Sequence, residues 1–294
     1  TSGESKTIDL DDCTTQVTMT TGVKFFERSS TQYICTQKAI AKWDNTNSQW
    51  IVLYGFGANT ATDATVYNDN NIFIAMGAST AYEYSTDSGD TWVVSTMVTK
   101  TFKFMRPYGA VFWATDNTTL YTNTGTGLNG SPTAWSGVSA ILGTSFNMNG
   151  LEGLGANVYA GKENTIAKID STPTITELMP EFRTLIDSQN FVGMYVWQGY
   201  LFLPTRTNLF VYDGTTITDI SPASYMPDVS ATRFQGQFKV LTGDTKWLYA
   251  ATATGGLACV RRETIAGETP ETDWRWHFLY DISTTLDNDG NAIN

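Results

Sequence analysis

Residues 200–213 read YLFLPTRTNLFVYD, an apolar run with an aromatic residue, a short polar turn and a second apolar run. The same pattern occurs in five other segments: QYICTQKAIAKW (32–43), NIFIAMGASTAYEY (71–84), AVFWATDNTTLYTN (110–123), NVYAGKENTIAKID (157–170) and WLYAATATGGLACV (247–260). The aromatic residues that mark the first run are separated by 40, 39, 47, 43 and 47 residues; they are Tyr33, Phe73, Phe112, Tyr159, Phe202 and Tyr249. The chain therefore contains a repeat that is a few tens of residues long.

Each repeat predicts a β-hairpin, because its apolar runs have the length of strands and its turns contain Gly, Asn, Asp, Thr or Lys. A β-rich period of about 40 to 45 residues is typical of propeller blades, which are four-stranded antiparallel sheets that stack around a ring. Each hairpin would supply strands B and C of a blade. Strand A precedes it in VKFFE, ATVYN, FKFMR, MYVWQ and FKVLT, and for the fourth blade it is expected within residues 144–153. Strand D follows in QWIVLY, TWVVST, AWSGV, TITELM, TITDIS and DWRWHFLY.

The sequence thus predicts an all-β fold, a β-propeller with six blades. We expect a single domain over residues 1–294, in which residues 1–20 and 277–294 close the ring or form terminal segments. A seventh blade built from both termini is an open alternative. Two stacked β-sandwich domains would also contain many short strands, but the regular spacing favours the propeller.

The turn that follows strand C of the second blade reads YSTDSGDTW (84–92). Its residues match the pattern S-x-D-x-G-x-T-W at Ser85, Asp87, Gly89, Thr91 and Trp92. This pattern resembles the Asp-box that recurs in sialidases and many other propellers. Ser and Asp can accept backbone N–H groups, Gly permits a positive φ, and the Trp ring can pack between sheets. We predict a structural role, because a C-to-D turn lies opposite the loops with which propellers usually bind ligands. Degenerate relatives of the motif end at Trp50, Trp135 and Trp274.

Composition excludes several classes of function. The net charge of −11 disfavours binding to a nucleic-acid backbone. No apolar run is long enough to span a bilayer, and TSGESKTIDL lacks the features of a signal peptide, so we expect no membrane insertion. The three cysteines, Cys13, Cys35 and Cys259, have no CxxC spacing and are expected to be free and mostly buried thiols.

Few residues suggest catalysis. The single histidine, His277, lies among aromatic residues in WRWHFLYD, which favours a packing role over a catalytic one. Asp287, Asp289 and Asn291 resemble the first half of a calcium loop, but the distal glutamate is missing and a solvated turn is the better interpretation. No phosphate-binding or nucleophile-elbow motif occurs. We therefore predict no catalytic residue, no metal site and no cofactor.

The enzymatic alternative is an Asp-box glycoside hydrolase of the sialidase type. Such an enzyme needs an arginine trio, for which Arg106, Arg206 and Arg233 are candidates, and two converging carboxylates. The arginine signature expected near the start of a sialidase is absent, because Arg28 lies in FFERSS.

The B-to-C turns should form one rim of the ring, and they define the candidate ligand face: Lys38, Asp116, Asn117, Lys162, Glu163, Asn164, Arg206 and Asn208. Such a rim suits sugar hydroxyls, a protein partner or solvent. Aromatic platforms for sugars could come from Tyr108, Tyr195, Trp197 or Tyr225, although packing between blades is the favoured interpretation. The longer connections near residues 123–133, 221–236 and 263–273 are the places where partner contacts are most readily added.

Two segments, GYLFLPTRTNLFVYDGTTITDISP (199–222) and KENTIAKIDSTPTITEL (162–178), resemble β-propeller segments of bacteriophage virion proteins. The resemblance implies a particle-associated structural or adhesion component and carries no active residues with it. Our leading interpretation is a non-enzymatic propeller for assembly or attachment, located in a virion or on a cell surface. Its partners would be other virion or surface proteins, with glycans as a second class of ligand. A third interpretation is a soluble Asp-box assembly factor similar to those that help to build photosynthetic complexes.

Overall fold

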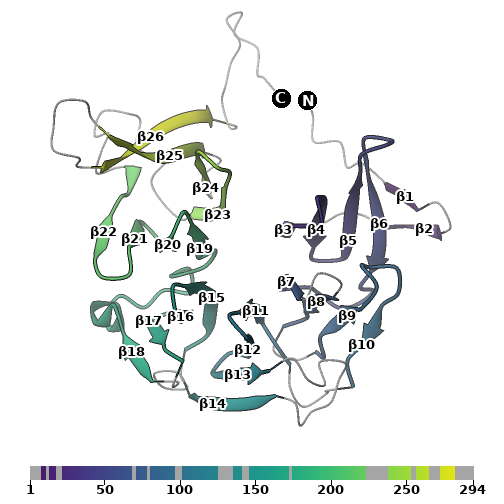
Figure 1. The fold of residues 1–294 in the computed structure, drawn as a ribbon, viewed down its shortest axis with the longest axis horizontal. Coiled ribbons are helices and arrows are strands. Elements are labelled where there is room, and N and C mark those ends of the chain that lie inside the picture. Colours follow the sequence, from purple (N-terminus) through teal and green to yellow (C-terminus); the bar gives the residue numbers. More distant parts are fainter. Residues whose placement is uncertain are drawn as a thin grey trace, which may run out of the picture. The chain divides into compact units, whose positions relative to one another are not determined.

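A computed structural model describes residues 8–10, 13–17, 22–67, 71–77, 80–96, 101–124, 135–140, 146–171, 174–222, 238–252, 256–264 and 272–281. Six four-stranded antiparallel sheets follow one another along the chain, and in each sheet the strands are paired in sequence order (Figure 1). These sheets are the six blades of a β-propeller, as the repeat predicts. No helix among the described residues is long and apolar enough to cross a membrane.

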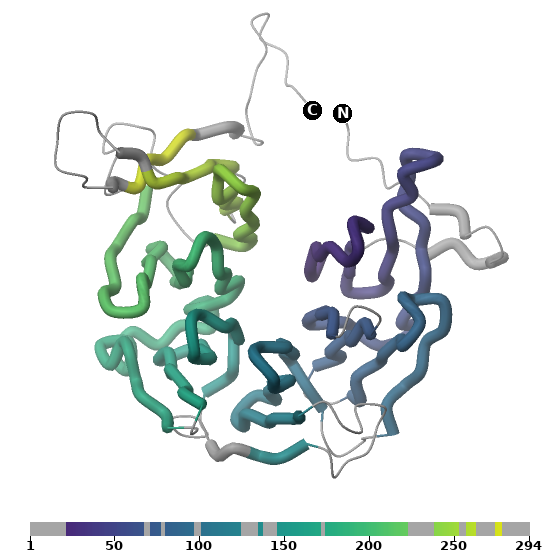
Figure 2. The backbone as a smooth tube through the Cα atoms, viewed as in Figure 1, coloured from purple at the N-terminus to yellow at the C-terminus, as the bar shows by residue number. Residues whose placement is uncertain are grey.

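The chain divides into two compact units, Gly3–Met148 and Asn149–Asn294, which we call the N-terminal and C-terminal units. Figure 2 follows the backbone through the described residues of the N-terminal unit, in purple to teal, and of the C-terminal unit, in teal to yellow. Each unit contains three blades. The prediction of one domain over the whole chain stays a prediction.

The N-terminal unit contains blades 1 to 3 and a separate hairpin. The hairpin pairs β1 (Ile8–Leu10) with β2 (Cys13–Val17), and the ring-closing role expected of residues 1–20 stays a prediction. Blade 1 consists of β3 (Gly22–Arg28), β4 (Thr31–Thr36), β5 (Ala39–Asp44) and β6 (Gln49–Gly55). Blade 2 consists of β7 (Asp63–Tyr67), β8 (Asn71–Ala75), β9 (Glu83–Ser85) and β10 (Val93–Val94). Blade 3 consists of β11 (Phe104–Tyr108), β12 (Val111–Thr115), β13 (Thr119–Asn123) and β14 (Ser136–Ala140).

The C-terminal unit contains blades 4 to 6. Blade 4 consists of β15 (Met148–Leu154), β16 (Asn157–Lys162), β17 (Thr165–Ile169) and β18 (Ile175–Glu177), and the 3-10 helix η2 (Pro180–Arg183) follows it. Blade 5 consists of β19 (Tyr195–Trp197), β20 (Tyr200–Pro204), β21 (Leu209–Tyr212) and β22 (Ile217–Asp219). Blade 6 consists of β23 (Phe238–Gly243), β24 (Leu248–Thr252), β25 (Gly256–Thr264) and β26 (Thr272–Asp281). All six predicted hairpins are confirmed as strands B and C of their blades.

The core of each unit consists of clusters in which aromatic side chains pack between successive blades. Five of the six marking aromatics are almost fully buried: Tyr33, Phe73, Phe112, Tyr159 and Phe202. Tyr249 differs, because the core-facing positions of its strand are Leu248 and Ala250. Its ring is half-buried and its hydroxyl donates to Asp244 Oδ2 at 2.9 Å.

Three tryptophans near the start of strand D pack against the preceding blade, whereas Trp50 of blade 1 contacts Phe25 and Trp43 of its own blade. Trp92 stacks on Tyr54 of blade 1 with ring centroids 5.3 Å apart. Trp274 makes an edge contact with Phe202 of blade 5 at 5.3 Å. Trp135 likewise contacts Tyr82 of blade 2. These rings therefore hold neighbouring blades together within each unit.

The turn 84–92 has the hydrogen bonds that its residues predict. Ser85 Oγ accepts from Gly89 N at 2.8 Å, and Asp87 Oδ1 accepts from Thr91 N at 2.9 Å. Gly89 has a φ of 99°, and a Cβ there would lie 2.7 Å from Leu53 Cδ1. Trp92 Nε1 closes the turn by donating to Gly89 O at 2.9 Å. These hydrogen bonds lie within the turn, and the hydroxyl of Tyr33 in blade 1 also donates to Ser88 O at 3.4 Å.

The C-to-D turns of three other blades also have an aspartate that accepts backbone N–H groups shortly after it. Asp44 Oδ1 accepts from Thr46 N at 2.8 Å, Asp170 Oδ1 from Thr174 N at 2.8 Å, and Asp213 Oδ1 from the N–H groups of residues 215 and 216 at 2.7 Å. An aspartate that caps its own turn is a common solution to the unsatisfied donors of tight turns. Blades 1, 2, 4 and 5 therefore share one turn chemistry.

Candidate binding face

The B-to-C turns and the D-to-A connections lie at the same edge of their blades, which we call the turn face. In blade 1, the backbone N–H groups of Phe56 and Ala61 donate to the carbonyls of Lys38 and Gln37 at 2.9 and 3.0 Å. Within the N-terminal unit, Met148 N also donates to Asn117 O in the turn of blade 3, at 3.2 Å. The predicted rim residues therefore lie among the connections that join neighbouring blades.

Lys38 is used inside the molecule. Its Nζ donates to the carbonyls of Ala58 and Asn59 at 3.2 and 2.7 Å and to Thr60 Oγ1 at 3.1 Å. The ammonium group thereby fixes the connection from blade 1 to blade 2.

Asp116 caps the turn of blade 3. Its Oδ1 accepts from the N–H groups of Thr118 and Thr119, both at 2.7 Å, and its Oδ2 accepts from the hydroxyl of Tyr121 at 3.0 Å. Burial and, next, the carboxylate of Asp116 raise the pKa of Tyr121. The side chain of Asp116 therefore stabilises the turn in which it lies.

The turn of blade 4 contains Lys162, Glu163 and Asn164. Lys162 is fully buried, and this burial lowers its pKa. Asn164 is also buried. The backbone carbonyl of Glu163 accepts from Asp187 N at 3.1 Å and from Asn190 Nδ2 at 2.9 Å. The turn thus binds a segment that follows it by more than twenty residues.

The turn of blade 5 contains Arg206 and Asn208. Arg206 Nη1 forms an ion pair with Asp187 Oδ2 at 3.1 Å, and Arg206 N donates to Asn190 Oδ1 at 3.4 Å. Asn208 Nδ2 donates to Asp219 Oδ2 at 2.8 Å. Of the predicted rim residues, Glu163 and Arg206 are therefore brought together by a third segment, residues 178–194.

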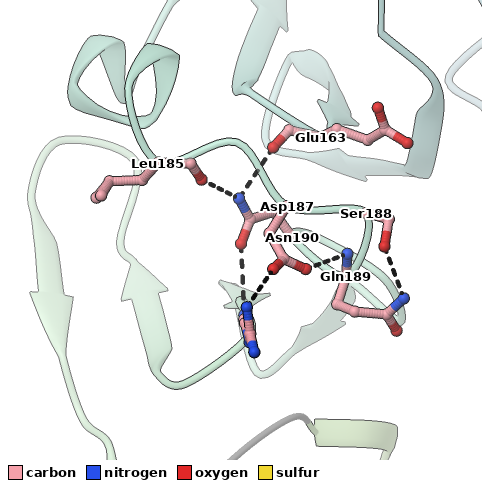
Figure 3. Close-up of polar contacts among 7 residues, drawn as sticks. Glu163, Leu185, Asp187, Ser188, Gln189 and Asn190 are labelled. Atoms are coloured by element: carbon pink, nitrogen blue, oxygen red, sulfur yellow. Dashed lines mark hydrogen bonds and ion pairs between the residues drawn. The ribbon is translucent and has the colours of Figure 1, made fainter.

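Residues 178–194 connect blade 4 to blade 5, and we call them the bracing loop. The side chain of Asn190 makes three of the hydrogen bonds that order this loop. Besides its bonds to Glu163 O and Arg206 N, its Nδ2 donates to Leu185 O at 2.8 Å (Figure 3). Asn149 Nδ2 reaches the loop from β15 and donates to the carbonyls of Ser188 and Asn190 at 3.0 and 2.9 Å. Asp187 Oδ1 accepts from Gln189 N at 2.9 Å. Two asparagines and an aspartate therefore fix the loop against both blades.

Two phenylalanines fasten the ends of the bracing loop to the core. Phe182 and Phe191 are both buried, with ring centroids 5.3 Å apart. Phe191 has a φ of 62°, which is rare for a bulky residue and is typically found at functional sites. Its side chain occupies space left by Gly161, since a Cβ on Gly161 would lie 2.5 Å from Phe191 Cβ and 3.1 Å from Phe191 Cγ.

The sequence interpretation did not identify the bracing loop as a site. It assigned longer connections at residues 123–133, 221–236 and 263–273, which lie largely outside the described residues together with Arg233 and Tyr225. The available signal was the gap between the predicted strands TITELM and MYVWQ, which is much longer than the gap between QWIVLY and ATVYN. A long ordered connection is frequently functional.

A second charged group lies on the innermost strands of the N-terminal unit. Asp63, which is 4% exposed, forms ion pairs with Lys24 Nζ and Arg106 Nη2, each at 3.6 Å, and accepts from Met105 N at 3.0 Å. Each of its two cationic partners comes from a different blade. Arg106, one of the predicted sialidase arginines, thus connects blades 2 and 3.

The other described residues that were considered as site candidates contact side chains or backbone groups of their own unit. His277 is exposed and makes an edge contact with the ring of Trp247 at 5.0 Å. Trp197 is buried, as the packing interpretation predicted, and donates to Asp244 O at 2.6 Å. Cys35 and Cys259 are buried free thiols whose pKa is raised by burial. The calcium-like loop at 287–291 lies outside the described residues, and no cluster of His, Cys, Asp and Glu within the described ranges could hold a metal.

Comparison with known proteins supports the fold. No family profile and no curated protein matches the sequence. Virginiamycin B lyase from Staphylococcus aureus is similar in structure, with a TM-score of 0.65 and 12% identity over 90% of this chain and 86% of the lyase. YCF48 from Cyanidioschyzon merolae has a TM-score of 0.56 and 12% identity over 88% of this chain and 85% of its own.

PorZ of Porphyromonas gingivalis is also similar, with a TM-score of 0.61 and 13% identity. The match covers 87% of this chain but 33% of PorZ, which is described as an essential bacterial surface component of the type-IX secretion system. These structural matches show likeness of fold. At identities of 12 to 13% they do not show the activity, which must be argued from the residues of this chain.

Proposed function

We propose that this protein is a non-enzymatic binding propeller that serves assembly or attachment through its turn face. The observation that carries the proposal is the bracing loop, in which charged and amide groups of two blades hold an ordered segment whose tip is exposed. Preorganised loops on a rigid scaffold are well suited to recognition, since little freedom is lost on binding. The ligand would be another protein or a glycan.

We further propose a location in a virion or on a cell surface. The likeness to phage propeller segments in residues 162–178 and 199–222 supports a virion, and the surface role described for PorZ supports an exposed location. Neighbouring genes that encode tail or capsid proteins would support the virion. A neighbourhood of metabolic enzymes would contradict both locations.

A glycan array combined with a panel of fluorogenic sialosides and other glycosides tests the proposal against a hydrolase. We expect binding to a glycan or to a co-purified particle protein, without turnover. The informative variants remove the carboxylates of the turn face: Asp116→Asn, Glu163→Gln and Asp187→Asn. Turnover that one of these substitutions abolishes would establish the hydrolase and overturn the proposal.

A further inference from the structure

The tip of the bracing loop is an exposed apolar pair, Leu185 and Ile186, next to two arginines. We propose that this tip docks a protein segment that presents an apolar side chain adjacent to one or two carboxylates. The inference rests on the proposed binding function and names the chemistry of the partner. It commits to a protein other than a second copy of this chain.

The length of the bracing loop exceeds what a connection requires. Blades 1 and 2 are joined by the seven residues between Gly55 and Asp63, whereas blades 4 and 5 are joined by the seventeen between Glu177 and Tyr195. Ordering each extra residue costs conformational entropy, which the anchoring phenylalanines and the asparagine hydrogen bonds must offset. The additional residues therefore present a surface in a fixed position.

The tip is both apolar and fixed. The side chains of Leu185 and Ile186 are 59% and 50% exposed. Leu185 N donates to Phe182 O at 3.1 Å, and Asp187 N, directly after the pair, donates to Glu163 O at 3.1 Å, so the backbone is held on both sides of the pair. Exposed apolar side chains on an ordered loop can be buried against a partner with little loss of freedom.

The charge around the tip indicates the partner's chemistry. The side chains of Arg183 and Arg206 are 63% and 72% exposed, although each contacts a carboxylate. Arg183 binds Glu177 through Nε and Nη2, and Arg206 binds Asp187 through Nη1. A guanidinium has five N–H donors, so each arginine has donors left for a further acceptor. Carboxylates suit these donors best, and arginine is enriched among interface residues that dominate binding energy.

This combination favours a protein over a glycan. Glycan sites commonly offer an aromatic ring on which a sugar stacks, and the tip presents aliphatic side chains instead. An acidic peptide with a Leu, Ile, Met or Phe side chain satisfies both the apolar pair and the arginines.

Selection of short random peptides displayed on phage against the immobilised chain tests the inference. We expect selected peptides to contain a large apolar residue next to Asp or Glu. Their affinity should fall about tenfold or more for the double variant Leu185→Ser/Ile186→Ser, as when central interface residues are removed. Arg206→Gln should weaken binding about threefold to tenfold, as expected for the loss of a charge-assisted contact.

The matched control is Val93→Ser/Val94→Ser, which removes a second exposed apolar pair, 47% and 50% exposed, from the outer strand of blade 2. It should change peptide affinity by less than about twofold, as surface substitutions away from an interface do. Circular dichroism and thermal unfolding must show both double variants to be folded. Should the tip variant fail to fold, Leu185→Ala and Ile186→Ala measured singly replace it.

Failure to select peptides, selection without acidic or apolar enrichment, or equal binding to the tip variant would overturn the inference. Self-association by sedimentation velocity that disappears in the tip variant would also overturn it, by identifying a second copy as the occupant. Glycan binding lost in the same variant would do so as well. Glycan or particle binding that survives in the tip variant leaves the proposed function intact, whereas carboxylate-dependent turnover would overturn that function without affecting peptide binding.

Discussion

The C-to-D turns and the bracing loop stabilise polar chain segments in different ways. In the turn 84–92, every hydrogen bond of Asp87 joins residues at most four positions apart. In the bracing loop, Asn149 Nδ2 donates to Asn190 O across 41 positions, and Glu163 O accepts from Asn190 Nδ2 across 27 positions. The first arrangement belongs to one blade, and the second joins two blades.

Because the two arrangements differ in reach, substitutions in them should have different effects. The hydrogen bonds of each turn aspartate stay within its own turn, and the same aspartate chemistry recurs in blades 1, 2, 4 and 5. The bracing loop requires Asn149, Glu163 and Arg206 to be in position at the same time. Alterations within it should therefore change the shape of the turn face as well as stability.

The largest expected effect is that of Phe191→Ala. The ring is fully buried against the space left by Gly161, and its loss should lower the free energy of unfolding by about 4 kcal/mol, as for other buried phenylalanines. Urea unfolding measures the change, and limited proteolysis should show new cleavage within residues 178–194. A loss below about 1 kcal/mol would show that the ring does not anchor the loop.

Trp92→Ala should have the second-largest effect on the free energy of unfolding. The ring is half-buried and stacks on Tyr54 of the preceding blade, so we expect a loss of about 3 kcal/mol, at the lower end for large aromatic truncations. Trp92→Phe, which keeps a stacking ring but removes the hydrogen bond to Gly89, should recover more than half of the loss. Equal losses for both variants would assign the effect to the hydrogen bond instead. Proteolysis of the bracing loop should be unchanged in either variant.

Much of the fold could be predicted from the sequence because the determining signals are local. The apolar hairpins and the residues of the turn 84–92 each interact mainly with positions nearby or at a fixed repeat, and their places are confirmed. Strand D of blade 2 was predicted as TWVVST, but β10 comprises Val93–Val94, since Thr91 and Trp92 take part in the turn.

The candidate site was less accessible to sequence analysis. Glu163 and Arg206 were predicted as rim residues, but the sequence does not show that the backbone carbonyl of Glu163 binds Asn190 or that Arg206 pairs with Asp187. Lys38 and Asp116 carry charges typical of ligand contacts, and the structure uses both to stabilise connections. Such long-range pairs form only when two blades pack together. The identity of one residue in the sequence does not show which distant residue it will contact.

Asn190→Ala should have an intermediate effect on stability and a large effect on the loop. The side chain is 2% exposed and makes three hydrogen bonds, so the carbonyls of Glu163 and Leu185 would lose a donor at a cost of about 2 kcal/mol. Cleavage within residues 178–194 should increase while the rest of the chain resists protease. The control Asn208→Ala, in the neighbouring turn, should leave the loop protected. Unchanged protection in Asn190→Ala would mean that the phenylalanines alone hold the loop.

The smallest expected effect is the pH-dependent change in stability of Asp87→Asn. It tests whether the turn 84–92 is independent of the bracing loop. Hydrogen bonds from the side chain and then the backbone of Thr91 lower the pKa of Asp87 from 3.8 to about 2. A carboxyl group with a lowered pKa stabilises the fold fully above its unfolded value and loses that contribution as pH falls through its folded value. Asp87→Asn should therefore be less stable than the parent protein near neutral pH.

The deficit of Asp87→Asn should shrink as pH falls from 3.8 towards about 2. Urea midpoints at a series of pH values measure it, and Asp90→Asn removes a charge from the same turn as a control. Protease cleavage of residues 178–194 should be the same in Asp87→Asn and in the parent protein at each pH, because no hydrogen bond of Asp87 reaches beyond its own turn. A deficit that stayed constant down to pH 2 would contradict the role of the Asp87 carboxylate. Loop cleavage that differed between Asp87→Asn and the parent protein would show that the two regions are not independent.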